Sequence, residues 1–255
     1  MARSFVSASS QYLYFDVGNG TSYPRTISAW INSNDVTNIL NVVGVNDFDH
    51  PNGIEFAIRV RGDVAGDIIE AVADQGTTSA VAQTTTGITI NKWHHVAAVF
   101  ASNTSRSIYI DGGSKGTNTT SITVPAAVSD YSIGCRYTAS SADRFFSGNI
   151  AEVAFWSTVL SDAEIYLLSK GYPPSYVRPA YHLFIYIPMM DYDNMNLAYL
   201  GNSKMRMFSE SGSPGVTPHP LIIEQPKTIQ NLVFPEATIT PPTPSASPFS
   251  HGFVF

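Results

Sequence analysis

One serine of the sequence stands in a pattern that serine hydrolases use. Residues 112–116, GGSKG, match G-x-S-x-G around Ser114. In that motif a sharp turn between a strand and a helix exposes a nucleophilic serine. The segment that follows, TNTTSITV, is rich in β-branched residues and predicts another strand instead of a helix. We therefore interpret the glycines as those of a hairpin turn and expect no catalytic residue here.

Two adjacent histidines, His94 and His95, have side chains that could ligate a metal ion. Successive side chains of a strand point to opposite faces of the sheet. Two such imidazoles cannot hold one ion together, as a zinc site would require. We expect a structural role for both.

The loop NDFDHPNG offers oxygen ligands of the kind that Ca²⁺ prefers, from Asp47, Asp49 and Asn52. The same residue types also build ordinary turns through hydrogen bonds between side chain and backbone. No metal or cofactor is therefore expected, with calcium at these three residues kept as the alternative to a plain turn.

The composition limits the class of protein that must position these residues. Of the 255 residues, 44% are hydrophobic, enough for a sizeable core, and 13% are charged, about half the usual share. A net charge of −6 argues against a nucleic-acid partner. We expect neither a membrane span nor a signal peptide, because no apolar run is long enough for either. A single cysteine, Cys135, excludes an internal disulfide and predicts a buried thiol.

Short apolar runs separated by turn residues recur along the first two thirds of the chain. Asp111 and Gly112 supply the positive φ angles that a type I′ hairpin turn requires. The spacing predicts an all-β fold, a two-sheet antiparallel sandwich of the jelly-roll type. The runs are QYLYFDV, RTISAWI, NILNVVGV, GIEFAIRV, GDIIEAVA, WHHVAAVFA, RSIYIDG, YSIGCRY and IAEVAFW.

A single helix, expected over residues 161–170, closes this series of strands. Ser161 and Glu164 form an S-x-x-E capping box, and Leu160 can act as a hydrophobic staple. Lys170 and Gly171 supply a cationic end and a C′ glycine. One helix after many strands indicates a mainly β domain over residues 1–171.

The order of these elements resembles a known family. KWHHVAAVF, RSIYIDGG and FFSGNIAEVAFWSTVLSDAEI are similar to motifs of laminin-G-like domains, which share the concanavalin A-like lectin and glucanase jelly roll. Those motifs read W-H-H-V-A, a strand ending in D-G, and G-x-I-D-E-V ahead of L-[ST]-x-x-E-I. Ala151 replaces the usual acidic residue. The resemblance covers residues 1 to about 171 and implies the fold, whereas lectins, glucanases, adhesion modules and viral structural proteins all use it.

The resemblance also defines what a catalytic member would need. Glucanases of this fold carry E-x-D-x-x-E on one strand, because a retaining mechanism needs two carboxyl groups about 5 to 5.5 Å apart. Glu55, Glu70, Glu152 and Glu164 lie in no such motif. We therefore expect that the chain is not an enzyme.

Exposed aromatic rings would be the other mark of a sugar-binding face. Trp30, Trp93 and Trp156 lie in strand patterns and are expected in the core. Four tyrosines could reach a surface, although nothing selects one as a ligand contact: Tyr12, Tyr14, Tyr131 and Tyr137.

The composition changes after residue 171. Only Pro24, Pro51 and Pro125 of the sixteen prolines precede that point. Proline removes backbone donors and fixes φ, so residues 172–255 predict an extended proline-rich arm with one or two short strands, one over residues 181–187. Apolar anchors suit such an arm to binding other protein surfaces. These anchors are Leu221, Ile222, Ile223, Leu232, Val233, Phe234, Phe253 and Phe255.

LFIYIPM and the later SGSPGVTPHPLI of the arm resemble the region that follows such jelly rolls in structural proteins of tailed phages. This resemblance implies a non-enzymatic bacteriophage virion protein, a capsid decoration or cement protein on the virion surface, present in the host cytoplasm during assembly. Its arm would dock on the major capsid protein, on other virion proteins or on neighbouring copies in a homo-oligomer. The alternative is a carbohydrate-binding adhesin module of a tail or head fibre, with cell-surface glycans as ligands. Neither function involves nucleic acid or a membrane.

Overall fold

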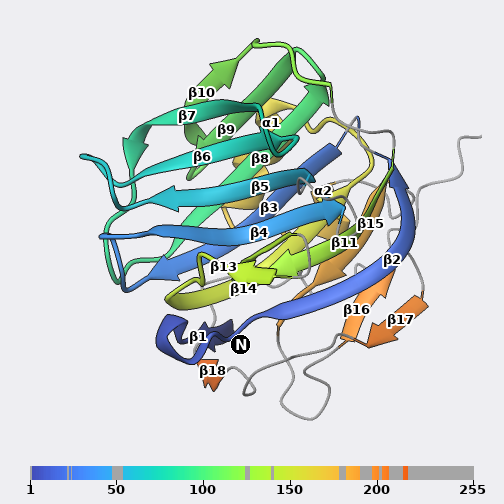
Figure 1. Ribbon diagram of the computed structural model, residues 1–255. Coiled ribbons are helices and arrows are strands. Elements are labelled where there is room, and N and C mark those ends of the chain that lie inside the picture. The colour runs from blue at the N-terminus through green and yellow to red at the C-terminus, as the bar shows by residue number, and fades with distance from the viewer. Residues whose placement is uncertain are drawn as a thin grey trace, which may run out of the picture. The chain divides into compact units, whose positions relative to one another are not determined.

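Two antiparallel sheets face each other and form a sandwich (Figure 1). The computed structural model describes residues 2–21, 23, 25–47, 54–123, 127–138, 141–177, 182–189, 197–200, 203–206 and 215–217. All of them belong to one compact unit, Met1–Ile223. The predicted all-β antiparallel sandwich is confirmed.

The smaller sheet has six strands. Their order across the sheet is β2 (Leu13–Thr21), β11 (Ala127–Ile133), β4 (Ile39–Asp47), β5 (Ile54–Arg61), β6 (Ile68–Asp74) and β7 (Ser79–Gly87).

The larger sheet has ten strands. Eight follow in the order β10 (Gly113–Asn118), β9 (Ser105–Ile110), β8 (His94–Ser102), β3 (Arg25–Ser33), β14 (Gly148–Trp156), β15 (Leu183–Ile187), β16 (Leu197–Leu200) and β17 (Ser203–Arg206). The other two are β1 (Ala2–Phe5), which pairs with β14, and β18 (Gly215–Thr217), which pairs with β1. A 3-10 turn, η1 (Ser7–Ser9), follows β1.

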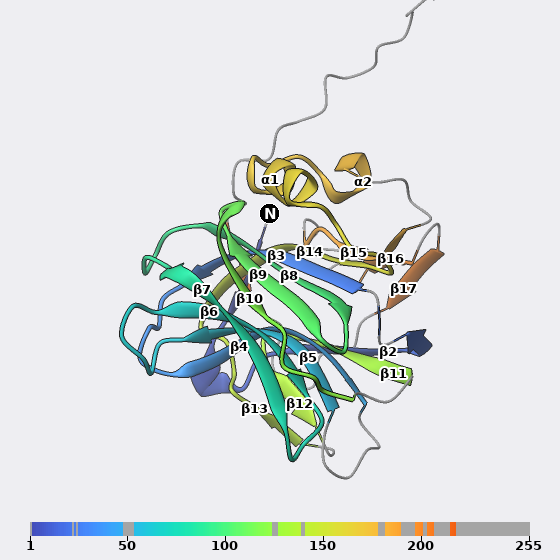
Figure 2. The same ribbon diagram turned by 90° about the horizontal axis from the view of Figure 1, so that it is seen from above.

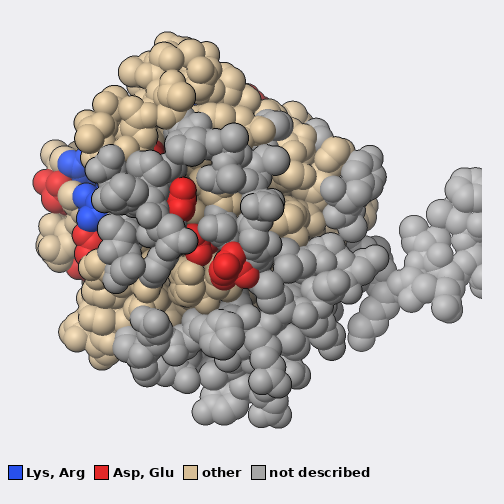
Figure 3. Space-filling view, turned by 45° about the vertical axis from the view of Figure 1, so that its right-hand side comes forward, with Lys and Arg blue, Asp and Glu red and all other residues tan. Residues whose placement is uncertain are grey.

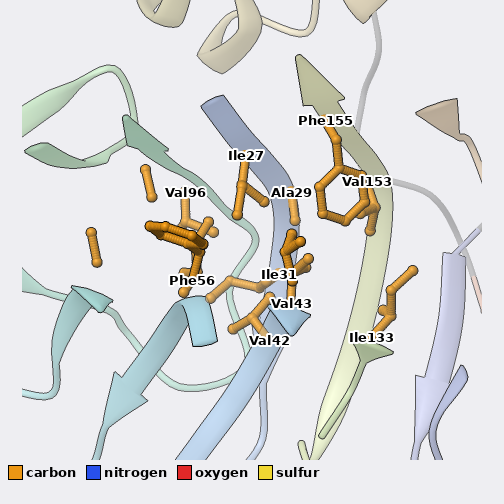
Figure 4. Packing of buried hydrophobic residues seen from close by; sticks show 14 of the residues in the cluster. Ile27, Ala29, Ile31, Val42, Val43, Phe56, Val96, Ile133, Val153 and Phe155 are labelled. Carbon is orange, nitrogen blue, oxygen red and sulfur yellow. The ribbon is translucent and has the colours of Figure 1, made fainter. Parts of the chain in front are cut away.

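Alternating apolar side chains of the two sheets fill the space between them. In Figure 4, Ile27, Ala29 and Ile31 of β3 approach Phe56 of β5 and Val43 of β4. These side chains are fully buried. The period-2 pattern of the sequence therefore places one face of each strand in a common core.

Short elements lie on the outer faces of both sheets (Figure 2). Two helices, α1 (Asp162–Ser169) and α2 (Pro174–Val177), lie outside the ten-stranded sheet. A hairpin of β12 (Arg136–Thr138) and β13 (Ser141–Asp143) lies outside the six-stranded sheet, against β4. No helix of the described residues is long and apolar enough to cross a membrane.

Helix α1 has the predicted capping box. The Ser161 side chain accepts a hydrogen bond from the backbone of Glu164, whose carboxylate accepts one from the backbone of Ser161 at 2.7 Å. At the other end the N–H of Gly171 donates to the carbonyl of Leu168 at 3.0 Å and the N–H of Tyr172 to that of Leu167 at 3.3 Å. With Gly171 at φ 85°, this is a Schellman ending.

Replacing Ser161 by alanine should lower the free energy of unfolding by about 0.5 to 2 kcal/mol, because the N-terminal N–H groups of α1 lose a partner. Urea unfolding of the intact chain measures this loss, and Ser157→Ala, outside the cap, is the matched control. Equal stability of the two variants would contradict the role of the cap.

Three features differ from the sequence-based interpretation or extend it. The strand after the Asp111–Gly112 turn begins at Gly113, before the predicted TNTTSITV segment. YSIGCRY splits between β11 and β12, because Gly134 at φ 84° ends the main-sheet strand. The strand predicted over residues 181–187 is confirmed as β15. The boundary at residue 171 stays a prediction, and β15 to β18 beyond it join the ten-stranded sheet.

Candidate functional site

The GGSKG segment forms a hairpin turn, as predicted. Asp111 and Gly112 have φ angles of 52° and 75°, and Ile110 pairs directly with Gly113 across the turn. Ser114 lies in β10, where its Oγ is 2.5 Å from Thr86 Oγ1. Strands flank the turn on both sides, whereas a nucleophile elbow needs a helix after the turn. Ser114 therefore does not lie in a nucleophile elbow.

The two histidines have separate surroundings. His94 Nδ1 is 2.8 Å from Asp111 Oδ2, and its Nε2 accepts a hydrogen bond from the N–H of Thr89 at 2.9 Å. His95 is 1% exposed, and its ring lies 5.5 Å from that of Trp30. They do not form a joint metal site.

The calcium candidates are only partly described. Asp47 ends β4 and is partly buried, whereas Asp49 and Asn52 lie outside the described residues. Within the described ranges, no group of three or more His, Cys, Asp or Glu side chains could hold a metal ion. Calcium therefore stays the untested alternative to a plain turn. The eight apolar anchors of the arm also lie outside the described residues.

The described structure gathers polar side chains on the outer face of the six-stranded sheet. Asn46 pairs with Glu55 in register, and Asn41 pairs with Arg59. Arg59 in turn pairs with Glu70 of β6. All five side chains belong to residues that are at most 8% exposed. We call these five residues the polar cluster.

Small residues allow the side chains of the polar cluster to meet. Gly44 and Ala57 pair with each other between the two polar pairs. A methyl group at Gly44 would come within 2.8 Å of Ser132 Oγ. The Nδ2 group of Asn41 donates a short hydrogen bond to Glu55 across this gap.

The hairpin β12–β13 covers part of this face. Tyr137 of β12 packs against Tyr12, which precedes β2, and Tyr14 of β2, with ring centroids 5.7 and 4.8 Å apart. Tyr12, Tyr137 and Tyr131 are buried, so the expectation that they could reach the surface is wrong for these three. The buried thiol predicted for Cys135, beneath the same hairpin, is confirmed.

Arginines surround the two glutamates of the polar cluster. Burial raises the pKa of Glu55, while the nearby positive charges of Arg59, Arg136 and Arg144 act in the opposite direction. Burial and the positive charges of Arg59 and Arg136 lower the pKa of Arg144. The positive charges therefore oppose the effect of burial on the Glu55 carboxyl group.

Glu70 has several partners at the margin of the polar cluster. It accepts hydrogen bonds from Arg61 Nη1 at 2.8 Å and from Gln83 Nε2 at 2.9 Å. The Nε atom of Arg59 lies 3.8 Å from its other oxygen, beyond hydrogen-bond distance. Gln83 is exposed and Arg61 partly so, which gives this side of the cluster a solvent-facing edge.

Four buried polar atoms on this face have no hydrogen-bond partner in the described structure. Two are acceptors, Asn41 Oδ1 and Asn46 Oδ1, and two are donors, Arg59 Nε and Arg144 Nη1. Buried polar atoms of native proteins normally have partners, so such atoms mark places where water or a ligand binds. These buried polar atoms were not predicted from the sequence. A signal was present, because Glu55, Ala57, Arg59 and Arg61 alternate with core residues along β5.

The described glutamates do not form a catalytic pair. Glu152 lies on β14, in the other sheet, and Glu164 caps α1. Glu55 and Glu70 share a face, but the guanidinium of Arg59 neighbours both. Neither has the free approach to a glycosidic bond that a general acid or nucleophile needs.

The tryptophans occupy three different environments. Trp156 is 1% exposed, as predicted for a core residue. Trp30 and Trp93 are partly exposed, and Trp93 precedes β8 instead of lying in a strand. Trp30 is therefore a candidate for contacting a ligand on the outer face of the ten-stranded sheet.

Comparisons with solved structures show the same fold. The chain resembles the native heptameric SAP-like pentraxin of Limulus polyphemus, with a TM-score of 0.51 and 12% identity over 66% of this chain and 81% of that one. It also resembles a protein of Bacteroides ovatus ATCC 8483 described as a candidate carbohydrate binding protein. That match has a TM-score of 0.56 and 17% identity over 84% of this chain and 60% of the other. A comparison with curated proteins gives no match.

The family model agrees with the topology. The model for the concanavalin A-like lectin/glucanases superfamily matches residues 7–166, more than half of the chain. This range runs from η1 into α1, and it includes the three motifs on which the resemblance was based. The chain belongs to the concanavalin A-like lectin/glucanases superfamily.

Proposed function

We propose that the chain is a non-catalytic carbohydrate-binding module whose ligand contacts the outer face of the six-stranded sheet. The observation that carries this proposal is the set of four buried atoms without partners, contributed by Asn41, Asn46, Arg59 and Arg144. The superfamily and the description of the Bacteroides ovatus protein support it.

The chemistry of these atoms suits a sugar. A sugar hydroxyl can donate to an asparagine oxygen and accept from an arginine nitrogen. The two acceptors and two donors of this face can therefore pair with sugar hydroxyl groups. Arg144 is partly exposed and offers the entry from solvent.

The charge pattern also suits a neutral or weakly charged ligand. On the face shown in Figure 3, basic side chains lie beside acidic ones at one edge, and further acidic side chains lie nearer the centre. The described residues of this face thus form no basic patch of the kind that a nucleic acid requires.

A glycan array with the intact chain tests the proposal. We expect binding to at least one glycan, weakened about tenfold or more by Arg144→Gln, because a charged hydrogen-bond donor is lost. Lys92→Gln, at an exposed position before β8, should bind like the parent chain. Absence of binding, or equal loss in both variants, would contradict the proposal.

The chain should release no reducing sugar from β-glucans. Glu55 and Glu70, the two described glutamates that share a face, are buried beside Arg59 and lack the access to a glycosidic bond that hydrolysis requires. Turnover that Glu55→Gln, Glu70→Gln or Glu152→Gln abolished singly would overturn this expectation.

The virion function stays a prediction that depends on the composition and resemblance of the arm. Capsid partners, a homo-oligomer and a location on the virion surface belong to that prediction. Truncation after Thr217 would remove all eight anchors, yet keep every described strand. A cement protein would then lose virion binding, whereas a carbohydrate-binding module would keep its glycan binding.

A further inference from the structure

Arg144 directly follows the β12–β13 hairpin and is held beside the polar cluster by its backbone. Its carbonyl accepts a hydrogen bond from the N–H of Asn41 in β4 at 2.9 Å. The next residue, Phe145, packs its ring against that of Tyr12, with the centroids 6.0 Å apart. These contacts fix the position of Arg144 on the outer face of the six-stranded sheet.

Two other arginines around this face form close ion pairs with carboxylates. Arg61 donates from Nε to Asp63 at 2.6 Å and from Nη1 to Glu70 at 2.8 Å. Arg136 donates two hydrogen bonds to Asp143, one from Nε at 2.6 Å and a short one from Nη2. The charges of these two guanidinium groups are therefore matched within the protein.

Arg144 has no such partner among the described residues. It takes part in none of their ion pairs. Its Nη1 atom is buried and has no hydrogen-bond partner, although the residue is partly exposed. A desolvated charge without a close partner is unfavourable, and an anionic ligand would supply that partner.

The surrounding charges favour one negative group at this position. Burial and the positive charges of Arg59 and Arg136 lower the pKa of Arg144, so the three guanidinium groups lie within electrostatic range of one another. A ligand anion at Arg144 would interact favourably with all three. The negative charges of Glu55 and Asp143 also act on Arg144. They disfavour a ligand with several negative charges.

The same face offers acceptors, which an inorganic anion cannot use. Asn41 Oδ1 and Asn46 Oδ1 are buried and have no hydrogen-bond partner in the described structure. An acceptor needs a donor such as a hydroxyl group, and chloride or sulfate has none. A ligand that satisfies both asparagines and Arg144 must combine hydroxyl groups with an anionic group. An acidic sugar has this combination.

We infer that the glycan bound on this face carries a carboxylate group, which pairs with the guanidinium of Arg144. The inference rests on the proposed function and names the class of its ligand, an acidic sugar of the uronic acid type. A flat carboxylate can accept two parallel N–H groups from a guanidinium. Asp143 accepts two hydrogen bonds from Arg136 in the same hairpin. Hydroxyl groups of the ligand would donate to Asn41 and Asn46.

Titration calorimetry of the intact chain with matched oligosaccharides tests this inference. Uronic acid oligosaccharides from pectin, hyaluronan and glucuronoxylan are each compared with their carboxyl-reduced counterparts, which keep the hydroxyl groups and lose the charge. At least one acid should bind about tenfold or more tightly than its reduced counterpart. Added salt should weaken the binding of the acid and not that of the reduced sugar. Equal affinity within every pair, or no binding of any acid, would overturn the inference.

Arg144→Gln tests which residue receives the carboxylate. The variant should bind the acid and its carboxyl-reduced counterpart with equal affinity, because the charged partner of the carboxylate is lost. Lys92→Gln, at an exposed position before β8, should keep the preference of the parent chain. An undiminished preference in Arg144→Gln would overturn the assignment of Arg144. The comparison of acid and reduced sugar on the parent chain decides the ligand class if Arg144→Gln fails to fold.

Failure of this inference can be distinguished from failure of the proposed function. Binding of neutral glycans alone, weakened by Arg144→Gln, would overturn the acidic ligand and leave the carbohydrate-binding function intact. No binding of any acidic or neutral glycan would overturn both. Binding of sulfated glycans in preference to uronic acids would show that the carboxylate is the wrong anionic group.

Discussion

Lowering the pH from 7 to 4 should reduce the free energy of unfolding by about 3 kcal/mol through His95 alone. Burial lowers the pKa of this histidine to about 4 in the folded protein, against about 6.5 in the unfolded chain. Between these values the unfolded chain binds a proton that the folded protein does not. The contribution of His95 to the free energy of unfolding is therefore complete above pH 6.5 and is lost as the pH decreases toward 4.

Urea unfolding at a series of pH values measures this effect by comparing the parent chain with His95→Gln. The variant should lose about 3 kcal/mol less than the parent chain between pH 7 and pH 4, whatever its stability at pH 7. Parallel curves for the parent chain and His95→Gln would contradict the burial of a neutral imidazole.

Replacing Gly116 by alanine should destabilise the fold by more than about 3 kcal/mol or prevent folding, through overpacking against rigid backbone. An added Cβ would lie 1.6 Å from the carbonyl oxygen of Gln83 in β7. β10 and β7 belong to different sheets, so this close approach closes one side of the sandwich.

Gly113→Ala is the matched control in the same strand. A Cβ at Gly113 would meet its nearest atom, the carbonyl oxygen of Ile110, at 4.0 Å. Its effect should stay within about 1 kcal/mol. Thermal unfolding of both variants decides the question, and similar losses would show that β10 does not need glycine at residue 116. This packing, not a nucleophile elbow, accounts for the last glycine of GGSKG.

The sequence predicts the fold well where apolar alternation is strong. Core residues alternate with smaller or polar ones in β3, β5 and β8. The position of each of these strands along the sequence is therefore predictable. β7, SAVAQTTTG, carries mostly small and polar residues and was not among the predicted strands. β1 has only four residues, too few for a periodic signal. Helix α1 was predictable because its capping residues act locally.

The candidate sites were less predictable because they depend on contacts between distant segments. Asn41 meets Glu55 only through the pairing of β4 with β5, and Arg144 approaches them on a separate hairpin. Glu152 lies at a bulge of β14, where the register with β3 shifts between Ala151 and Ala154, and no local sequence pattern predicts this bulge. Register and bulges are properties of the assembled sheet, so residue types and spacing alone did not identify these sites.

Mapping a bound glycan by NMR tests whether the outer face of the six-stranded sheet is the binding site. Amide shifts of the ¹⁵N-labelled chain should be recorded during titration with the strongest ligand from the glycan array. We expect the shifts to concentrate on β4, β5 and the β12–β13 hairpin, around Asn41, Arg59 and Arg144. Shifts confined to β3, β8, β14 and the helices would place the ligand on the other sheet and contradict the account.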